Sequence, residues 1–555
     1  MSRTSMTVVA SNSRQQFALR VCWAVLGGLL MVFAFPDYGL WWLILPALMC
    51  MLGALRGSRP GQGALIGAAA GASFYLAHIS WAQEFLGPIP WLALAGLMTL
   101  WWAGFGAVIA VAYQRLRTGS AMAKPATSAA IMALAIAGLW TFREWCSSTL
   151  PYNGFAWGRV AQSQQDSPVL EAVSWLGTSG LSFALVWCAA FALELVVQYR
   201  AHAARGERNV VAAGDQHRTL AIVRHVRTGT AARFLGQMAG GLAALSVLAV
   251  IPAWATLTPG DTQGETTILA VQGNSPGASY FIPSAPGQII REHLDASYDA
   301  LEANPQARPD LILWPEGSLD VNPVLNTSVE TALNKLTERA GAPLLANTVT
   351  WQGKLQSDDA EFYNSQVLWT DGAIAGQYDK RRPVPFGEYV PDRHIYEAIV
   401  PDLIGLIQRE YLPGERSNVL AVNDVAYGIF ICFDIVDDEL ARTAVREGAQ
   451  VLLAPTNNAD FAYTHEAAQQ LAFARMRAVE TGRSLVQVST VGMSASYAPD
   501  GAVLDALPWY TSDAMLVTVP LRTGTTPAVA IGRWLEAAVS AMGVLLAFGM
   551  RPRRE

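Results

Sequence analysis

Charged residues are scarce in this sequence of 555 residues. Asp, Glu, Lys and Arg together make up 15% of the chain, below the share of about a quarter that is usual in soluble domains, whereas hydrophobic residues reach 52%. The formal net charge of −6 is modest and has the wrong sign for a protein that binds the phosphates of nucleic acids. The composition therefore argues against nucleic-acid binding and favours an integral membrane protein.

Cysteine is also sparse. The five cysteines show neither a CxxC spacing nor a pattern of metal ligands, so we expect no disulfide framework and no metal site. Cys22, Cys50 and Cys188 lie inside apolar runs, where cysteine packs as a small hydrophobic residue. Cys432 differs from these because it ends the strand-like run Val425–Cys432.

Long apolar segments recur through the first half of the chain. Each has about 20 residues, the length of a helix that crosses a bilayer. We expect seven such spans at roughly 18–35, 38–55, 63–81, 90–113, 126–143, 179–198 and 234–255, and an eighth at roughly 528–549. The sequence therefore predicts a multi-pass α-helical membrane bundle of about eight spans. The 18 tryptophans suit such a bundle, because tryptophan gathers at the membrane interface.

The basic residues of the loops predict an orientation. Arginine and lysine cluster in the N-terminal tail, after the second, fourth and sixth spans, and at the C-terminus. With eight spans, all five clusters fall on one side of the membrane, which the positive-inside rule makes cytoplasmic. We therefore expect a membrane domain over 1–258, an extracytoplasmic domain over 259–525, and an eighth span with a basic cytoplasmic tail over 526–555.

The segment after the seventh span reads as a soluble α/β domain. Strand-like runs alternate there with helical patterns near 288–303, 327–340 and 464–482, which predicts sheets covered by helices. The expected strands are Thr266–Val271, Leu311–Trp314, Leu344–Val349, Tyr427–Cys432, Val451–Ala454, Leu485–Ser489 and Met515–Val519. The Pro-rich stretch Arg381–Gly414 lacks a regular pattern and is either a surface loop, or a lid or membrane-contacting loop.

Three polar side chains stand at the ends of separate apolar runs of this domain. Cys432 is a candidate nucleophile, Glu316 a candidate base for its thiol, and Lys380 a candidate partner for the negative charge of a tetrahedral intermediate. Taken singly, a cysteine at a strand end is more often a core residue, and a Glu or Lys is more often a surface charge. The argument depends on the segments around them: Trp314–Gly317, Tyr378–Glu388 and Ile431–Asp434.

These segments resemble the Glu-Lys-Cys triad of the nitrilase superfamily. The run Tyr378–Pro391, which contains Pro-Phe-Gly-Glu-Tyr-Val-Pro, is similar in particular to the apolipoprotein N-acyltransferase branch. Further similarities lie at Val271–Asn274, Ala472–Glu480 and Ser489–Ser494, and in the membrane part at Phe33–Pro36 and Gly154–Gly158. The resemblance implies an outward-facing catalytic domain with the nitrilase-like α-β-β-α sandwich fold, carried by eight spans.

The resemblance also implies roles and substrates. Glu316 would be the general base, Lys380 the oxyanion stabiliser and Cys432 the nucleophile. Glu388 and Asp434 would be supporting carboxylates. Cys432 would take an acyl chain from a membrane phospholipid, typically phosphatidylethanolamine, as a thioester. The α-amine of the diacylglyceryl-cysteine of an apolipoprotein would then take the chain from the enzyme. The protein would reside in the bacterial inner membrane, and the chemistry requires no cofactor.

Several positions depart from the pattern of that family. Asp460 stands where the family usually has Trp, Ala462 replaces a Gly, and Gln470 replaces a His. Asp434 replaces the Glu two residues after the nucleophile. The triad itself is intact, so these changes bear on the docking of substrates and not on the chemistry.

Other residues are candidates for substrate contact. Trp157 and Phe155 either line the entry for acyl chains or anchor the protein at the membrane interface. The same loop is flanked by the charged residues Arg143, Glu144 and Arg159. They are either ordinary solvated charges or contacts for phospholipid headgroups. The last candidates, in the family-like segments of the soluble domain, are Phe386, Asn457, Asn458 and Asp460.

Two other functions are compatible with parts of the sequence. A membrane-tethered nitrilase-type amidase would share the triad and let water attack the thioester. The membrane-side similarities and the apolar stretch Arg381–Gly414 favour a lipid acyl donor over a small amide. A non-enzymatic membrane scaffold is less compatible, because a relic domain should have lost at least one of Glu316, Lys380 and Cys432.

Overall fold

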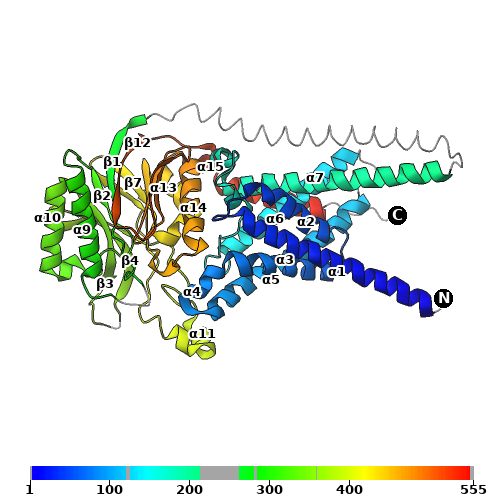
Figure 1. The fold of residues 1–555 in the computed structure, drawn as a ribbon, viewed down its shortest axis with the longest axis horizontal. Coiled ribbons are helices and arrows are strands. Elements are labelled where there is room, and N and C mark those ends of the chain that lie inside the picture. The colour runs from blue at the N-terminus through cyan, green and yellow to red at the C-terminus, as the bar shows by residue number, and fades with distance from the viewer. Residues whose placement is uncertain (1–2, 120–124, 213–261, 280–283, 358, 550–555) are drawn as a thin grey trace.

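The structure is a computed structural model that describes residues 3–119, 125–212, 262–279, 284–357 and 359–549. Its two parts lie end to end (Figure 1): a bundle of long helices and a domain of two β-sheets with helices on both outer faces. The expected seventh span at 234–255 lies outside the described residues.

The helical part contains most of the predicted spans. Its longer helices are α1 (Arg3–Ala34), α2 (Ile44–Leu55), α3 (Pro60–His78), α5 (Pro88–Gly119), α6 (Pro125–Thr149), α7 (Val173–Ala212) and α16 (Arg533–Val544). Short helices connect or extend them: η1 (Trp41–Leu43), η2 (Ser80–Ala82), α4 (Gln83–Leu86), η3 (Val160–Gln164), η4 (Leu170–Ala172), α15 (Pro527–Ile531) and η8 (Leu545–Gly549).

Four segments of the described chain are helical, long and apolar enough to cross a membrane: Ser13–Ala34, Pro88–Arg117, Thr127–Thr149 and Leu170–Ala201. A fifth, Trp41–Leu55, is apolar but shorter. The predicted span at 528–549 is divided into the short elements α15, α16 and η8. A membrane part is thus present, whereas the number of eight spans stays a prediction.

Two six-stranded sheets form the other part. The first has the order β12-β1-β2-β3-β4-β5 and the second β11-β10-β9-β8-β7-β6. The strands of the first are β1 (Thr262–Gln272), β2 (Leu311–Leu313), β3 (Leu344–Gln352), β4 (Glu361–Thr370), β5 (Ala373–Asp379) and β12 (Asp513–Arg522). Those of the second are β6 (Val419–Val422), β7 (Val425–Ile429), β8 (Val451–Thr456), β9 (Ser484–Ser489), β10 (Ser494–Tyr497) and β11 (Val503–Leu507).

Helices cover both outer faces of the paired sheets. The helices α9 (Gln288–Ala303) and α10 (Thr327–Ala340) cover the first sheet, and α13 (Asp438–Arg446) and α14 (His465–Thr481) lie between the second sheet and the bundle (Figure 1). Alternate strand residues point to opposite faces, so Ile268 and Ile429 pack between the sheets while Leu269 packs under the outer helices. This is the expected α-β-β-α sandwich.

The predicted stretch Arg381–Gly414 is more ordered than its sequence suggests. It contains the two short helices α11 (Arg393–Ile399) and α12 (Pro401–Ile404). Val390, Ile404 and Ile407 bury their side chains in a small core of their own. Ile399 is nevertheless 68% exposed, so this segment presents apolar surface to its surroundings.

The helical part and the catalytic domain share one hydrophobic core. Trp157 and Val160 of the loop after α6 pack in the same cluster as Phe473 and Val479 of α14. Gly177, at a break within α7, has φ +64°, and a Cβ there would lie 2.9 Å from the Arg442 guanidinium. The two parts are therefore packed directly against each other and not joined by a tether alone.

Candidate active site

Lys380 lies between two buried carboxylates. It follows β5 directly, and its Nζ is 2.9 Å from Glu316 Oε1 and 2.9 Å from Glu388 Oε2. Glu316 lies three residues beyond the end of β2, and Lys380 and Glu388 both lie in the segment after β5, so two strands of the same sheet deliver the three groups. All three side chains are at most 3% exposed. A buried charge of this kind persists only when it is paired and hydrogen-bonded, as here.

Asn364 of β4 binds both carboxylates. Its Nδ2 donates to Glu316 Oε1 and to Glu388 Oε1, at 2.7 Å each. Its Oδ1 accepts from Asn347 Nδ2 at 2.8 Å, and Asn347 Oδ1 accepts from the Gly317 N–H at 2.8 Å. Because each amide has one donor end and one acceptor end, this chain fixes the orientation of Asn364. Neither asparagine was predicted from the sequence.

Cys432 stands at a bend and not on the strand, which corrects the prediction that the strand reaches it. The strand β7 ends at Ile429, and Cys432 begins the 3₁₀ turn η6 (Cys432–Val436) with φ +49°. Such a φ is uncommon outside glycine and is often found at functional sites. Gln470 Nε2 lies 3.3 Å from Cys432 Sγ, while Gln470 Oε1 accepts from Thr456 Oγ1 at 3.1 Å.

The resting cysteine is a thiol. Burial and the carboxylate of Glu316 together raise the pKa of Cys432 to about 12, against the opposing effect of the Lys380 ammonium. Burial alone would lower the pKa of Lys380, but Glu316 and Glu388 outweigh it and hold this pKa well above its ordinary value. The site therefore needs a base to convert the Cys432 thiol to a thiolate. The Lys380 ammonium stays charged beside that thiol.

Asp434 lies in the same turn but belongs to a different set of contacts. It accepts hydrogen bonds from Tyr378 Oη at 2.7 Å and from the Arg382 N–H at 2.8 Å. These bonds join the turn of Cys432 to the residues around Lys380. Burial raises the pKa of Asp434 to about 6. These contacts hold the turn of Cys432 against the segment that follows β5.

The predicted aromatic candidates meet beside the nucleophile. Trp157 stacks on Phe433, the residue after Cys432, with ring centroids 5.7 Å apart and planes at 8°. Phe155 also stacks on Trp157, with ring centroids 5.4 Å apart and planes at 11°. Trp157 is buried, so it is part of the wall next to Cys432 and not an anchor at the membrane surface.

The remaining candidates lie around the same site. The N–H of Asn457 donates to Glu316 Oε2 at 3.1 Å, and Asn458 Nδ2 donates to the carbonyl of Gly492 at 3.0 Å. Asp460 accepts from Ser279 Oγ at 2.5 Å. Phe386, two residues before Glu388, packs its ring edgewise on Tyr396 at 4.8 Å. Asn457 therefore contacts the carboxylate of Glu316, whereas Asn458, Asp460 and Phe386 contact the surrounding loops.

Arg477 of α14 joins two acidic residues to the turn that carries Cys432. Its guanidinium pairs with Glu480 and Asp438, and it donates to the carbonyls of Ile435 and Val436 at 3.1 Å each. Both carbonyls belong to the turn that starts at Cys432. A buried arginine thus fixes the backbone that carries the nucleophile.

Together these groups can perform covalent acyl transfer. A half-buried thiol, a carboxylate and an ammonium next to that thiol supply a nucleophile, a base and a positive charge for an oxyanion. The thioester that such a thiol forms divides one difficult transfer into two easier steps.

Two family models match this chain. The model described as "Apolipoprotein N-acyltransferase N-terminal domain" matches residues 27–191, and the model "Carbon-nitrogen hydrolase" matches residues 270–527. The first covers helices of the bundle and the second the sandwich of sheets.

Curated relatives match along nearly the whole length. An apolipoprotein N-acyltransferase of Mycolicibacterium smegmatis is 29% identical over 94% of this chain and 83% of its own length. One from Shewanella oneidensis is 25% identical over 96% and 95%. Among solved structures, an amidase of the nitrilase superfamily from Nesterenkonia is 18% identical, covers 50% of this chain and 97% of its own, and has a TM-score of 0.36.

Proposed function

The chain belongs to the apolipoprotein N-acyltransferase family, and from this premise we propose the reaction and the roles of its residues. It is a membrane-bound acyltransferase that moves a fatty acyl chain from a phospholipid to the α-amine of the N-terminal diacylglyceryl-cysteine of lipoproteins. The observation that carries the chemistry is the buried cluster of Glu316 and Lys380 beside the Cys432 thiol.

In the first half-reaction, Glu316 accepts the proton of Cys432 and the thiolate attacks an ester carbonyl of the phospholipid. The Lys380 ammonium stabilises the oxyanion, since its full charge is buried and held in place by two carboxylates. Collapse of the intermediate forms the thioester and breaks the ester bond, and the proton held by Glu316 passes to the departing lysophospholipid oxygen.

In the second half-reaction, the α-amine of the acceptor attacks the thioester. Glu316 takes the proton that the amine loses and passes it to Cys432, which departs as a thiolate and so returns to the thiol. Glu388 keeps Lys380 charged and fixed in place throughout, because it pairs with the same ammonium and accepts the Val384 N–H at 2.7 Å.

The finer features follow the same proposal. We place the domain boundaries near 258 and 525, with eight spans, the catalytic domain outside the inner membrane and both termini in the cytoplasm. The start of α1 and the end of α7 lie at the end of the bundle remote from the sheets (Figure 1), which agrees with a cytoplasmic location of the basic segments there. Phosphatidylethanolamine is the proposed donor.

The competing function is amide hydrolysis by the same triad. The family model matched at residues 27–191 and the stacking of Trp157 on Phe433 favour the transferase, because a hydrolase of small amides needs neither. The test is incubation of the purified protein with phosphatidylethanolamine and a diacylated lipopeptide. Mass spectrometry should show one added acyl chain on the peptide amine. Release of free fatty acid with an unmodified peptide would contradict the proposal.

A further inference from the structure

A charged cavity opens where the helical part meets the catalytic domain. It has a volume of about 250 Å³ and lies between the loop after α6, the start of α13 and the start of α16. Phe433 and Val436 form part of its wall. Both belong to the turn that begins at Cys432, so the cavity lies beside the turn that carries the nucleophile.

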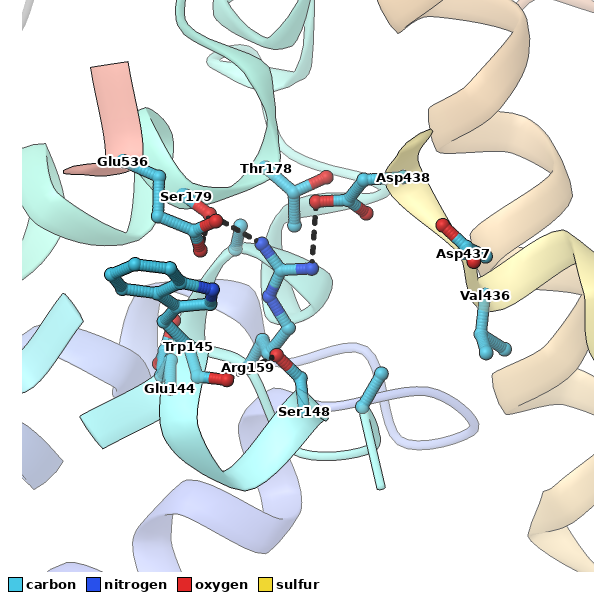
Figure 2. Close-up of polar contacts among 12 residues, drawn as sticks. Glu144, Trp145, Ser148, Arg159, Thr178, Ser179, Val436, Asp437, Asp438 and Glu536 are labelled. Atoms are coloured by element: carbon cyan, nitrogen blue, oxygen red, sulfur yellow. Dashed lines mark hydrogen bonds and ion pairs between the residues drawn. The ribbon is translucent and has the colours of Figure 1, made fainter. Parts of the chain in front are cut away.

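The lining of this cavity is balanced in charge. It contains four arginines and four carboxylates. Arg159 donates to Asp438 at 2.9 Å and to Ser179 at 2.7 Å, and Ser179 in turn donates to Glu536 at 2.6 Å (Figure 2). A lining with no net charge favours a molecule that carries both signs over a simple anion.

One buried donor of the lining remains open to a ligand. Arg159 is 5% exposed, and its Nε has no hydrogen-bond partner within the part of the chain that the structure describes. An unpaired donor of this kind is costly when buried, and a ligand oxygen in the cavity would satisfy it. The expectation of solvated charges is therefore wrong for Arg159.

A second arginine of the lining is accessible. The side chain of Arg533 is 59% exposed, and its Nε is 3.5 Å from Glu439 Oε2, which is longer than a good hydrogen bond. Arg446 binds the other oxygen of Glu439 at 2.7 Å but does not line the cavity. Arg533 is thus free to turn toward an incoming phosphate at little cost.

The position of the cavity suits a lipid headgroup. It lies at the ends of α6 and α16 that face the catalytic domain, where a bilayer that surrounds these helices would end. Near its rim, Leu150 is 57% and Trp534 80% exposed, as side chains in contact with lipid would be. The ester carbonyls of a glycerophospholipid are only a few bonds away from its phosphate, so a headgroup here leaves them near Cys432.

We propose that this cavity binds the zwitterionic headgroup of the phospholipid acyl donor. Arg159 and Arg533 bind the phosphate, and Glu536 binds the ammonium. This inference rests on the proposed function. It goes further by stating where the donor's headgroup binds and which charges select the donor lipid. It predicts that lipids with a phosphate and an amine load the enzyme better than lipids with a phosphate alone.

The test measures loading of the full-length protein in detergent micelles with one lipid at a time. The rate of acyl-enzyme formation, read as intact mass, is followed against the mole fraction of phosphatidylethanolamine or phosphatidylglycerol. Arg533→Gln should raise the half-saturating fraction of phosphatidylethanolamine about fivefold and leave the maximal rate unchanged. Glu536→Gln keeps an acceptor for Ser179 and should reduce the preference for phosphatidylethanolamine over phosphatidylglycerol.

Arg446→Gln is the matched control, because Arg446 also pairs with Glu439 but does not line the cavity. The substitution removes the same positive charge as Arg533→Gln does. It should load like wild type. The inference is overturned if Arg446→Gln and Arg533→Gln behave alike, or if the cavity variants slow only the discharge of the thioester by a diacylated lipopeptide, since the cavity would then serve the acceptor. A wild-type protein that forms no adduct with either lipid overturns the proposed function, and this inference with it.

Discussion

Asn364 should be indispensable for acyl loading, although it takes no part in bond making. Its Nδ2 donates to both Glu316 and Glu388 at 2.7 Å, beside the Lys380 ammonium that pairs with the same two carboxylates. Asn364→Ala removes two hydrogen bonds to carboxylates, which are worth about 1.5–3 kcal/mol each. Without the Asn364 amide between them, Glu316 and Glu388 repel each other more strongly around Lys380. The carboxylate of Glu316 is then no longer held in one orientation.

The loss should appear mainly in the rate of the first half-reaction. If about 2–4 kcal/mol of this interaction is lost from the transition state, acyl loading slows about 30- to 1,000-fold. The assay is the single-turnover rate of thioester formation with phosphatidylethanolamine. Asn347→Ala, which removes only the bond that orients Asn364, should slow loading less.

The matched control is Asn418→Ala. Asn418 is buried in the same domain and donates to the carbonyl of Ile429 at 3.2 Å, away from the carboxylates. Its loss should lower the unfolding temperature and leave the loading rate of the folded protein intact. Loading by Asn364→Ala at the wild-type rate, or an equal loss in Asn418→Ala, would refute the reasoning.

Three further predictions concern the turn of Cys432. Since burial raises the pKa of this thiol to about 12, alkylation by iodoacetamide without lipid should accelerate about tenfold per pH unit between about pH 7 and 9; a rate independent of pH would contradict the raised pKa. Burial raises the pKa of Asp434 from 3.8 to about 6, so the folded protein holds a proton that the unfolded chain releases. Stability should fall by about 3 kcal/mol as the pH rises from about 4 to 6, and Asp434→Asn should flatten this slope in thermal unfolding; an unchanged slope would assign it to another group. Arg477→Lys cannot bind the carbonyls of Ile435 and Val436 and both acids at once, and it should lower the maximal loading rate about tenfold without changing the half-saturating lipid fraction; a change in that fraction alone would argue against a positioning role.

The sequence predicted the strands whose residues are apolar. The runs at β1, β2, β3, β8 and β9 lie in the interior of the sandwich, so hydrophobicity marks them. The strand β4 was missed because it carries Asn364, Ser365 and Gln366 in succession, and these buried polar residues interrupt the apolar pattern. The same burial is what makes Asn364 important for the site.

Two local features were hidden for different reasons. The apolar run at Phe430 and Ile431 continues past the last paired residue of β7, so the pattern extended the strand as far as Cys432. The hairpin of β6 and β7 turns at Asn423 and Asp424, both with positive φ, which is the turn chemistry that the sequence does offer. The pair Asn423-Asp424 therefore marks the turn of this hairpin in the sequence itself.

The positions of the charged residues could be predicted only in part. Glu316 and Lys380 follow strands of the first sheet and Cys432 follows a strand of the second, and catalytic groups are commonly found at strand ends of this kind. The burial of Arg159 could not be foreseen, because its partner Asp438 is 279 residues away along the chain. Ion pairs across two packed parts leave no local pattern in the sequence.

The central claim is that Cys432 carries the acyl chain as a thioester. The most direct measurement is the intact mass of the purified protein after incubation with phosphatidylethanolamine, for wild type and for Cys432→Ala. The account predicts a gain of one fatty-acyl mass in the wild type alone, lost on addition of a diacylated lipopeptide or of hydroxylamine, which cleaves thioesters. An adduct of equal size in Cys432→Ala, or no adduct in the wild type while the lipopeptide is still N-acylated, would contradict it.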